Sequence, residues 1–392
     1  YFGLAELLRK AGHEVIFFSM KDDKNLPCEQ SEYFVSNVDF NGELNIRDKV
    51  NAAARMVYSL EAKKKISALI EKEQPDIVHI NLFHRVLTAS IVDAAKKHHI
   101  PVVFTMHDLN CFCPNHTMLD HGKICEACLH GNYLNCVKRV CFKNSRAKCL
   151  MAALESEYNK LSGLYNKIDL YITPSEFYRK KMIESGLTRN KIVCFRNFLP
   201  DNKFEPLKYV NGSYYLYFGR LSAEKGIMTL LKAVQNVPEM RLEIAGTGPM
   251  EQELQNFVRN GKMENRVHFN GFLSGKSLTD LIIEAKCIVL PSEWYENGPY
   301  SIMEAMAAGK PVIVSGEGGL PEIVQDGENG FICDAFRPNS LAECIRKMEQ
   351  LNDIQYDQMA ANASKRAAQM FSADQYLTNL IAEYRRLVML GV

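Results

Sequence analysis

No run of apolar residues in this sequence is long enough to cross a membrane, because a spanning helix needs roughly 18–20 of them in succession. A secretory signal is also missing from its start. Glycine and proline are sparse, at 23 and 14 of 392 residues, which excludes collagen-like and low-complexity chains. We therefore expect a globular protein of the cytoplasm, and peripheral contact with the inner face of a membrane stays open.

The sequence does not open on a methionine. It starts within YFGLAELLRKAGHEV, where an amphipathic helix pattern runs into a strand pattern. A protein in which strands and helices alternate usually begins with a strand, so we expect the first strand of the fold to be absent from this sequence.

A dense basic stripe of the kind that binds nucleic acid is missing as well. The net charge is +1, although residues 1–210 hold 30 Lys and Arg against 24 Asp and Glu, and the remainder holds 17 against 22. A mildly basic first half suits an anionic ligand or an anionic membrane surface. Ordinary scatter of solvated charge explains this asymmetry equally well.

What the sequence contains is an alternation of short apolar runs and helical patterns, typical of parallel sheets covered by helices. Strands are expected at residues 13–20, 76–80, 101–105, 168–172 and 191–195, and again at 214–218, 240–245, 267–269, 287–290, 311–314 and 330–333. A long helix is expected from about residue 47 to 73.

These patterns predict two doubly wound, Rossmann-like α/β domains. The irregular stretch 198–213 separates an N-terminal domain, residues 1–197, from a C-terminal domain, residues 214–371. Residues 372–392 read as a last helix that can pack back on the N-terminal domain. Such domains bind ligands beyond the carboxyl ends of their strands, so we expect the site where the two domains face each other.

The segment PSEWYENGPYSIMEAMAAGKP holds Glu296 in the loop after a strand and Glu304 one turn inside the next helix. Glu304 stands in an otherwise apolar helical segment, and a carboxylate on a buried helix face is costly unless it is paired or binds a ligand. Backbone N–H groups between the two glutamates are expected to face phosphate at the helix amino end. The intervening residues concerned are Asn297, Gly298, Pro299, Tyr300 and Ser301.

Two earlier turns contain glycine. In FGRLSAEKG, Gly219 ends a strand, and Arg220 and Lys225 can neutralise a diphosphate from two sides, although surface residues beside a turn give the same pattern. In IAGTGP, Gly246 and Gly248 would let the backbone come close to a phosphate or ribose, which alone is a weak signal.

Together, FGRLSAEKG, IAGTGP, PSEWYENGPYSIMEAMAAGKPVI and GGLPEIV resemble the retaining glycosyltransferases of family 4, which have the GT-B fold. The resemblance implies that Arg220 and Lys225 grip the donor diphosphate, that Glu296 contacts the donor sugar and that Glu304 holds the ribose. It also implies that backbone amides of residues 297–301 meet sugar and phosphate. The turn with Phe272 and Leu273 resembles the place where the base lies.

In the first half, Thr105-Met-His107-Asp108 ends an expected strand. The resemblance implies that a His here approaches the donor sugar from the opposite domain, so His107 joins Glu296, Arg220 and Lys225 as an expected catalytic group. A His that only caps the strand end is the alternative. Asp108 would orient His107 or serve the acceptor.

An insert at residues 111–149 contains seven of the twelve cysteines, and similar inserts occur in a subset of this family. Cys125, Cys128, Cys136 and Cys141 have the spacing C-x2-C-x7-C-x4-C, which suits a structural zinc ion, whereas free thiols packed in a loop are the alternative. Cys113 could replace one of the four. Basic residues beside them suit an anionic lipid headgroup or a solvated helix face; they are Lys138, Arg139, Lys143, Arg146 and Lys148.

The expected reaction is transfer of a sugar, with retention, from a nucleotide sugar to a saccharide or lipid-linked saccharide in surface polysaccharide or glycan biosynthesis. A UDP-sugar is favoured by its frequency in the family. No Asp-x-Asp motif follows a strand, so we expect cations and helix amino ends, and no catalytic metal, to stabilise the leaving diphosphate. Two alternatives are a catalytically silent subunit of the same fold, which binds the nucleotide sugar or partners an active transferase, and a sugar-nucleotide epimerase.

Overall fold

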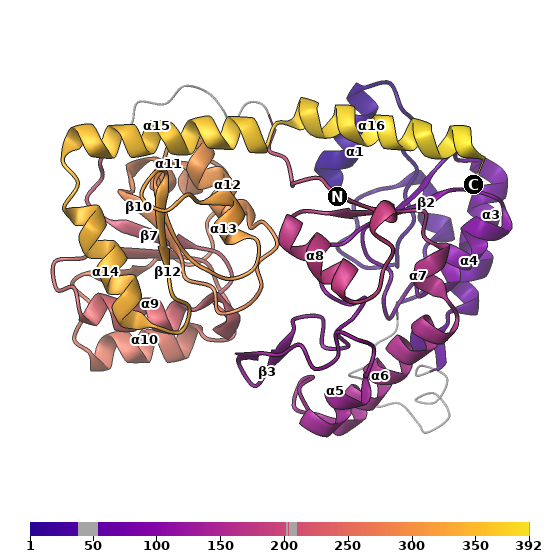
Figure 1. Cartoon of the computed structure of the whole chain (residues 1–392), viewed down its shortest axis with the longest axis horizontal. Helices are drawn as coiled ribbons and strands as arrows, with labels where there is room; N and C mark the ends of the chain where they lie inside the picture. The colour runs from indigo at the N-terminus through magenta and orange to yellow at the C-terminus, as the bar shows by residue number, and fades with distance from the viewer. Residues whose placement is uncertain (38–53, 201–202, 204–209, 392) are drawn as a thin grey trace.

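The computed structural model describes residues 1–37, 54–200, 203 and 210–391. Its helices and strands form two α/β units, each built on one parallel sheet, and these units lie beside each other in Figure 1. Among the described residues, no helix is both long enough and apolar enough to span a bilayer.

The first sheet has the strand order β1-β2-β5-β6, and all neighbouring strands are parallel. Its strands are β1 (Val78–Ile80), β2 (Val102–Thr105), β5 (Leu170–Thr173) and β6 (Ile192–Cys194). Every residue of β2 and β5 is buried, because helices cover both faces, so these strands are continuous apolar runs. The helices of this part are α1 (Phe2–Lys10), η1 (Glu29–Tyr33), α3 (Leu60–Glu73), α4 (Ser90–Lys97), α5 (Leu134–Arg139), α6 (Arg146–Leu161), α7 (Leu164–Lys167), α8 (Glu176–Glu184) and η2 (Arg189–Lys191), and a small hairpin pairs β3 (Leu119–Asp120) with β4 (Lys123–Ile124).

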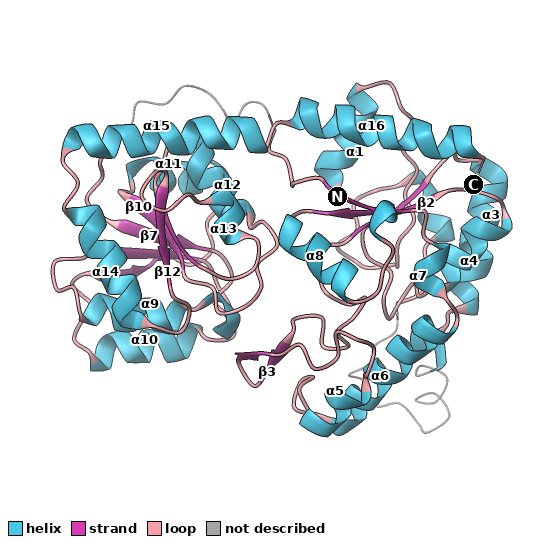
Figure 2. Cartoon of the chain, viewed as in Figure 1, coloured by secondary structure: helices cyan, strands magenta, loops and turns pink. Residues whose placement is uncertain are grey.

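The second sheet has the order β12-β11-β10-β7-β8-β9 and is also parallel throughout. Its strands are β7 (Tyr215–Phe218), β8 (Leu242–Ala245), β9 (Val267–Phe269), β10 (Cys287–Leu290), β11 (Val312–Ser315) and β12 (Gly330–Cys333). Helices surround this sheet in Figure 2, and together they bury one continuous apolar core. They are η4 (Ala223–Lys225), α9 (Ile227–Gln235), α10 (Glu251–Asn260), α11 (Gly275–Glu284), α12 (Tyr300–Ala307), α13 (Leu320–Ile323), α14 (Pro338–Glu349) and α15 (Asp353–Met370).

The chain passes between the two units at two neighbouring points. The Leu199 N–H donates to the Phe371 carbonyl (2.9 Å), and Leu199 forms an isolated bridge with Ser372. Helix α16 (Ala373–Leu390) then continues past α15 onto the first unit, as Figure 1 shows. There Tyr376 and Leu380 pack on the first sheet, so the C-terminal helix contributes to the N-terminal core.

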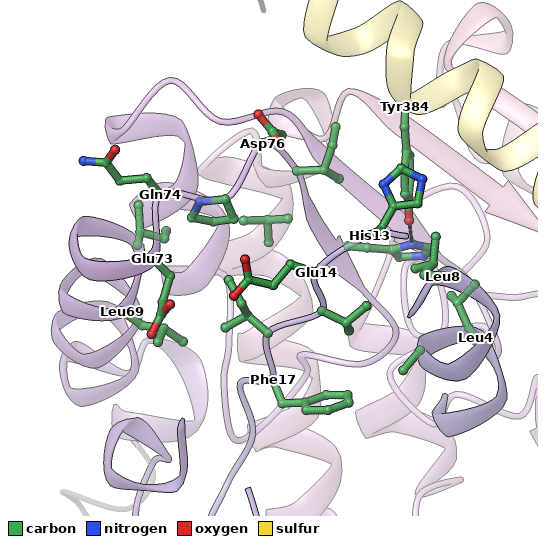
Figure 3. Close-up of a pocket in the computed structure, with 18 of the residues that line it drawn as sticks. Leu4, Leu8, His13, Glu14, Phe17, Leu69, Glu73, Gln74, Asp76 and Tyr384 are labelled. Atoms are coloured by element: carbon green, nitrogen blue, oxygen red, sulfur yellow. Dashed lines mark hydrogen bonds between the residues drawn. The ribbon is translucent and has the colours of Figure 1, made fainter. Parts of the chain in front are cut away.

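Residues 13–20 do not form the strand that their pattern predicts. They carry no regular secondary structure, and only Met20 makes a bridge, to Val35. Strand β1 is the edge of the first sheet, and a cavity separates it from this segment, lined from one side by Phe17 and from the other by Asp76 (Figure 3). A strand requires a neighbouring backbone for its hydrogen bonds, so an apolar pattern without such a neighbour gives a loop.

The helix expected at residues 47–73 is also not continuous. Residues 47–53 lie outside the described residues, and residues 54–57 form a separate helical turn. Helix α3 begins after Ser59, whose Oγ accepts a hydrogen bond from the Ala62 N–H (3.1 Å). This serine cap starts a new helix within a pattern that reads as one.

Candidate active site

Glu296 lies in the loop after β10 and is buried, with 4% of its surface exposed. Its Oε1 accepts a hydrogen bond from the Ser292 hydroxyl (2.6 Å) and forms an ion pair with Lys225 Nζ (2.7 Å). The Ser292 carbonyl in turn accepts a bond from the Ser315 hydroxyl (2.6 Å) at the end of β11. Two neighbouring strands therefore hold this carboxylate in one orientation.

Lys225 and Arg220 come from the segment that follows β7, the strand next to β10. Lys225 lies on η4, 5.0 Å above the Trp294 ring, and its charge is taken up by Glu296. Arg220 is exposed, while its backbone carbonyl accepts the Tyr217 hydroxyl (2.7 Å). The two expected diphosphate cations thus lie in one segment, but only Arg220 extends into solvent without an ion pair among the described residues.

Glu304 is not on a buried helix face, contrary to the expectation from its apolar neighbours. Its side chain is 27% exposed and forms an ion pair with Lys203 (3.3 Å). Helix α12 has its buried face at Ile302, Met303 and Met306, and Glu304 lies at the margin of that face. The sequence pattern was misleading because five of the six residues after Ser301 are apolar and buried, while Glu304 lies on the same side as the half-buried Ser301.

The amino end of α12 provides backbone N–H groups beside Glu296. The helix follows Pro299 as its N-cap, and the first intrahelical bond is from the Ile302 N–H to the Pro299 carbonyl (3.1 Å). The N–H groups of Tyr300 and Ser301 therefore precede the helical ladder, and the Tyr300 ring is 52% exposed. This helix end has the geometry of an anion site.

The predicted glycine turns pack mainly on each other. A Cβ on Gly246 would lie 1.9 Å from the Gly219 carbonyl oxygen, and one on Gly248 would lie 2.3 Å from the Leu221 carbonyl oxygen. The Gly246 N–H also donates to the Gly271 carbonyl (2.6 Å), which brings the turn with Phe272 and Leu273 to the same place. Phe272 is 74% exposed. The glycines are thus required for close contact between loops of the same unit.

His107 follows β2 of the first unit. Its Nε2 contacts Asn81 Oδ1 (3.1 Å). The ring is accessible to solvent, but the surrounding protein displaces much of the water around it, and this desolvation lowers the pKa of His107 to about 4. Asp108 accepts hydrogen bonds from the N–H and the amide of Asn110 (3.1 and 2.8 Å), and burial raises its pKa. Among the described residues, Asp108 makes no hydrogen bond to His107, so its expected orienting role is not visible.

Asn297 joins the two units at this point. Its Nδ2 donates to the Met106 carbonyl (3.0 Å) and lies 3.5 Å from the His107 carbonyl, and its Oδ1 accepts from the Ser175 hydroxyl (3.0 Å). Asn197 of the crossing segment donates to the Gly298 carbonyl (3.2 Å). The structure therefore brings His107, from the first unit, beside the loop that carries Glu296.

Sequence reasoning missed Glu322, although GGLPEIV was among the recognised motifs. Its carboxylate accepts the N–H groups of Glu176 and Phe177 (2.9 and 2.5 Å), at the amino end of α8 in the other unit, and pairs with Arg196 (3.1 Å). Gly319 allows this approach, since a Cβ there would lie 2.8 Å from the Cβ of Ser175, the N-cap of α8. A motif alone does not show which helix its carboxylate will cap.

The Cys-rich insert holds its thiols close together without forming a metal cage. Cys136 and Cys141 have their Sγ atoms 3.5 Å apart, and Cys149 bonds to the backbone of Phe142. No group of three or more His, Cys, Asp or Glu side chains within the described ranges is arranged to hold a metal ion. None of the described cysteines of this insert is in a disulfide, and several lie in a small apolar cluster of their own.

Two parallel-sheet units that bring the loops after β2 and β10 together have the arrangement of the GT-B fold. The chain matches the family model Glycosyltransferase Family 4 over residues 2–203 and the model Glycosyl transferases group 1 over residues 200–366. It belongs to glycosyltransferase family 4. The enzyme class and fold expected from the sequence are thereby confirmed.

Characterised and uncharacterised relatives support this assignment. An uncharacterized glycosyltransferase of Methanocaldococcus jannaschii is 26% identical over 98% of this chain and 92% of its own. The O-antigen chain mannosyltransferase B of Escherichia coli is 25% identical over 73% of this chain and 70% of its own. The sulfoquinovosyl transferase of Arabidopsis thaliana is 27% identical over 48% of this chain but only 38% of its own.

Solved structures show the same fold. Sucrose-phosphate synthase of Thermosynechococcus elongatus superposes with a TM-score of 0.70 at 20% identity, covering 99% of this chain and 92% of its own. The Anabaena protein HepE, in complex with UDP, superposes with a TM-score of 0.63 at 20% identity, covering 82% of each chain.

Proposed function

We propose that this glycosyltransferase transfers a sugar, with retention at the anomeric carbon, from a UDP-sugar to a saccharide or lipid-linked saccharide acceptor. The observation that carries the proposal is the convergence of Glu296, its partner Lys225 and the amino end of α12 beside His107 of the opposite unit. A carboxylate, a cation and free backbone N–H groups are the groups that a sugar diphosphate requires.

In this scheme the departing nucleoside diphosphate gains negative charge on its β-phosphate. Arg220, Lys225 and the first N–H groups of α12 stabilise that charge in a site fixed before the reaction starts. Glu296 holds hydroxyls of the donor sugar, with His107 on the opposite side, while Glu304 holds the ribose and the turn at Phe272 and Leu273 holds the base. The scheme needs no catalytic metal ion.

The preference for uridine rests on family frequency and on the Anabaena protein HepE, which has been solved with UDP and with UDP-glucose. The acceptor class rests on relatives named for O-antigen and colanic acid synthesis. Peripheral contact with an anionic membrane through the basic residues of the insert stays a prediction. Arg139 contributes less than expected, because it pairs with Asp120 (2.8 Å).

A panel of labelled UDP-, GDP- and ADP-sugars tests the proposal, with hydrolysis or transfer as the readout. We expect turnover of a UDP-sugar by the wild type and its loss in Glu296→Gln. Binding of UDP without turnover of any donor would favour the silent subunit. Conversion of the sugar while it stays attached to the nucleotide, seen by NMR, would favour the epimerase.

A structural zinc ion at Cys125, Cys128, Cys136 and Cys141 also stays a prediction, and the described geometry does not hold one as it stands. Elemental analysis of the purified chain decides the matter. One zinc per chain, lost in Cys128→Ser and retained in Cys287→Ser outside the insert, would establish it.

A further inference from the structure

Three basic side chains surround one aromatic ring in the insert of the first unit. The Arg85 guanidinium lies 4.5 Å from the centre of the buried Phe142 ring, and Lys143 Nζ lies 5.7 Å from it. The His116 ring centre is 6.1 Å away, edge to face. These groups come from three separate segments, so the tertiary structure and not local sequence assembles them.

This cluster lies beside the proposed active site. Burial raises the pKa of Asp108, which is next to His107, and the positive charge of Arg85 opposes this shift. On the other side, burial and the charges of Arg85 and Lys143 lower the pKa of His116 to about 4, against the opposing charge of Glu224, next to Lys225. The cluster is therefore within electrostatic range of both the loop after β2 and the segment after β7, which carry His107 and Lys225.

The two permanent cations of the cluster have no ion-pair partner among the described residues. Arg85 Nη2 donates only to the Pro114 carbonyl (3.2 Å). Glu155 is buried and accepts a hydrogen bond from the Arg85 backbone N–H (2.8 Å). Burial raises the pKa of Glu155 to about 7, so this carboxyl neutralises Arg85 incompletely. Lys143 is exposed and directed to the Phe142 ring. The carboxylates of Asp108 and Glu155 lie within range of the Arg85 charge, but neither forms an ion pair with it among the described residues, which leaves the cations able to bind an anion.

The backbone at this cluster is also unusual. Arg85, His116 and Lys143 all have left-handed φ angles, of 72°, 57° and 50°. Such angles are costly for residues other than glycine and persist only where the surrounding structure requires them, which is common at ligand sites. Beside Arg85, the His84 ring is buried with neither nitrogen hydrogen-bonded.

We propose that Arg85, His116 and Lys143 bind an oxyanion of the acceptor, either a phosphate or a carboxylate, and so select charged over neutral acceptor saccharides. Arg85 can bind two oxygens through its planar fork, and Lys143 adds a point charge from the exposed side. The inference rests on the proposed function only in calling the bound molecule an acceptor.

Titration calorimetry on the full chain tests this inference. Binding of glucose 6-phosphate, glucuronate and methyl glucoside is measured with UDP at saturation, so that Arg220 and Lys225 are already occupied. We expect one of the two anionic sugars to bind at least about tenfold more tightly than the neutral one, and the difference to shrink as salt is raised. The better of the two identifies the oxyanion as phosphate or carboxylate.

Variants locate the site. Arg85→Gln and Lys143→Gln should each weaken binding of the anionic sugar about tenfold, because each loses a charge-assisted contact. Lys148→Gln, an exposed lysine of the same insert, should change it less than about twofold. Lys143→Gln keeps the test valid if Arg85→Gln fails to fold. Equal binding of charged and neutral sugars, or equal effects of the Lys143 and Lys148 substitutions, would overturn the inference.

The donor proposal is judged separately, by UDP affinity. It should be unchanged in the Arg85 and Lys143 variants and reduced in Arg220→Gln. Failure of UDP to bind the wild type would contradict the proposal that the donor is a UDP-sugar. The anionic-sugar titration, with the Arg85 and Lys143 variants, would still decide the acceptor site.

Discussion

The Nζ atom of Lys225 lies 2.7 Å from Oε1 of Glu296, and both side chains are largely withdrawn from water. The expected diphosphate cation and the expected sugar-binding carboxylate are therefore partners before any donor arrives. Because the pair is shared, a donor that engages Lys225 also changes the charge balance at Glu296. Arg220, exposed and unpaired within the described part of the chain, has no such coupling.

This difference predicts unlike effects for the two cations. Lys225→Met leaves the buried Glu296 charge without its partner, so the free energy of unfolding should fall by about 3–5 kcal/mol. Arg220→Gln should leave stability within about 0.5 kcal/mol, as is usual for exposed positions. Urea unfolding measures both, and UDP titration should show weaker binding in each. Equal stabilities of the two variants would contradict the pairing.

Adding Glu296→Gln to Lys225→Met removes the orphaned charge. The double variant should regain part of the stability lost by Lys225→Met, since neither buried charge remains. Additive losses in this double-mutant cycle would mean that the two side chains do not interact in solution.

Glu296→Gln keeps the shape of the side chain but loses its charge. Turnover of the nucleotide sugar should drop at least about 100-fold, as for removal of one transition-state contact, while UDP, which lacks the sugar, should bind with a similar affinity. Glu343→Gln, an exposed glutamate of α14, is the matched control and should retain its activity. Unchanged turnover in Glu296→Gln would remove this residue from the site.

Glu322→Gln tests the contact between the units. The neutral amide loses the charge-assisted bonds to the α8 amino end and to Arg196, so stability should fall by about 1–3 kcal/mol. Small-angle X-ray scattering should also show a larger radius of gyration, because this contact holds the units together. Glu328→Gln, on the exposed surface, should change neither quantity. A compact Glu322 variant of normal stability would contradict this role.

Acid should destabilise the protein through two buried histidines. Burial lowers the pKa of both His79 and His84 to about 3. Above the ordinary histidine pKa of about 6.5, these side chains are neutral in both the folded and the unfolded protein. Between about 6.5 and 3, they take up a proton only in the unfolded protein. Stability therefore falls as the pH drops from about 6.5 towards 3, by about 2 kcal/mol for each histidine at about pH 5.

Glu155 has the opposite effect, because its raised pKa lets the folded state bind a proton at a higher pH than the unfolded state does. Between about pH 7 and the ordinary pKa of a glutamate, acid therefore stabilises the folded state through Glu155, which offsets part of the stability lost through the histidines. Urea unfolding at several pH values measures the slope. His84→Leu, which replaces an unpartnered ring, should be less sensitive to acid than the wild type. An identical slope in both proteins would show that His84 is not buried as a neutral ring.

Most strands, and the loop that carries Glu296, could be predicted from the sequence. The runs at 102–105, 170–173, 215–218 and 287–290 are continuous and apolar because both faces of a parallel sheet are covered, and that pattern is local. Residues 13–20 carry a similar pattern but lack a paired neighbour, which no local pattern reveals. Glu304 was misjudged for a related reason, since burial depends on what packs against α12.

The sequence by itself determined the two α/β units, the loop from Glu296 to Glu304 and the cations after β7, because side-chain periodicity and turn composition are properties of neighbouring residues. The tertiary structure alone decided that Lys225 pairs with Glu296, that Glu322 caps a helix of the other unit, and that Arg85, His116 and Lys143 meet around Phe142. Those relationships join residues far apart in the chain, and only the packing of separate elements brings their atoms within a few ångströms.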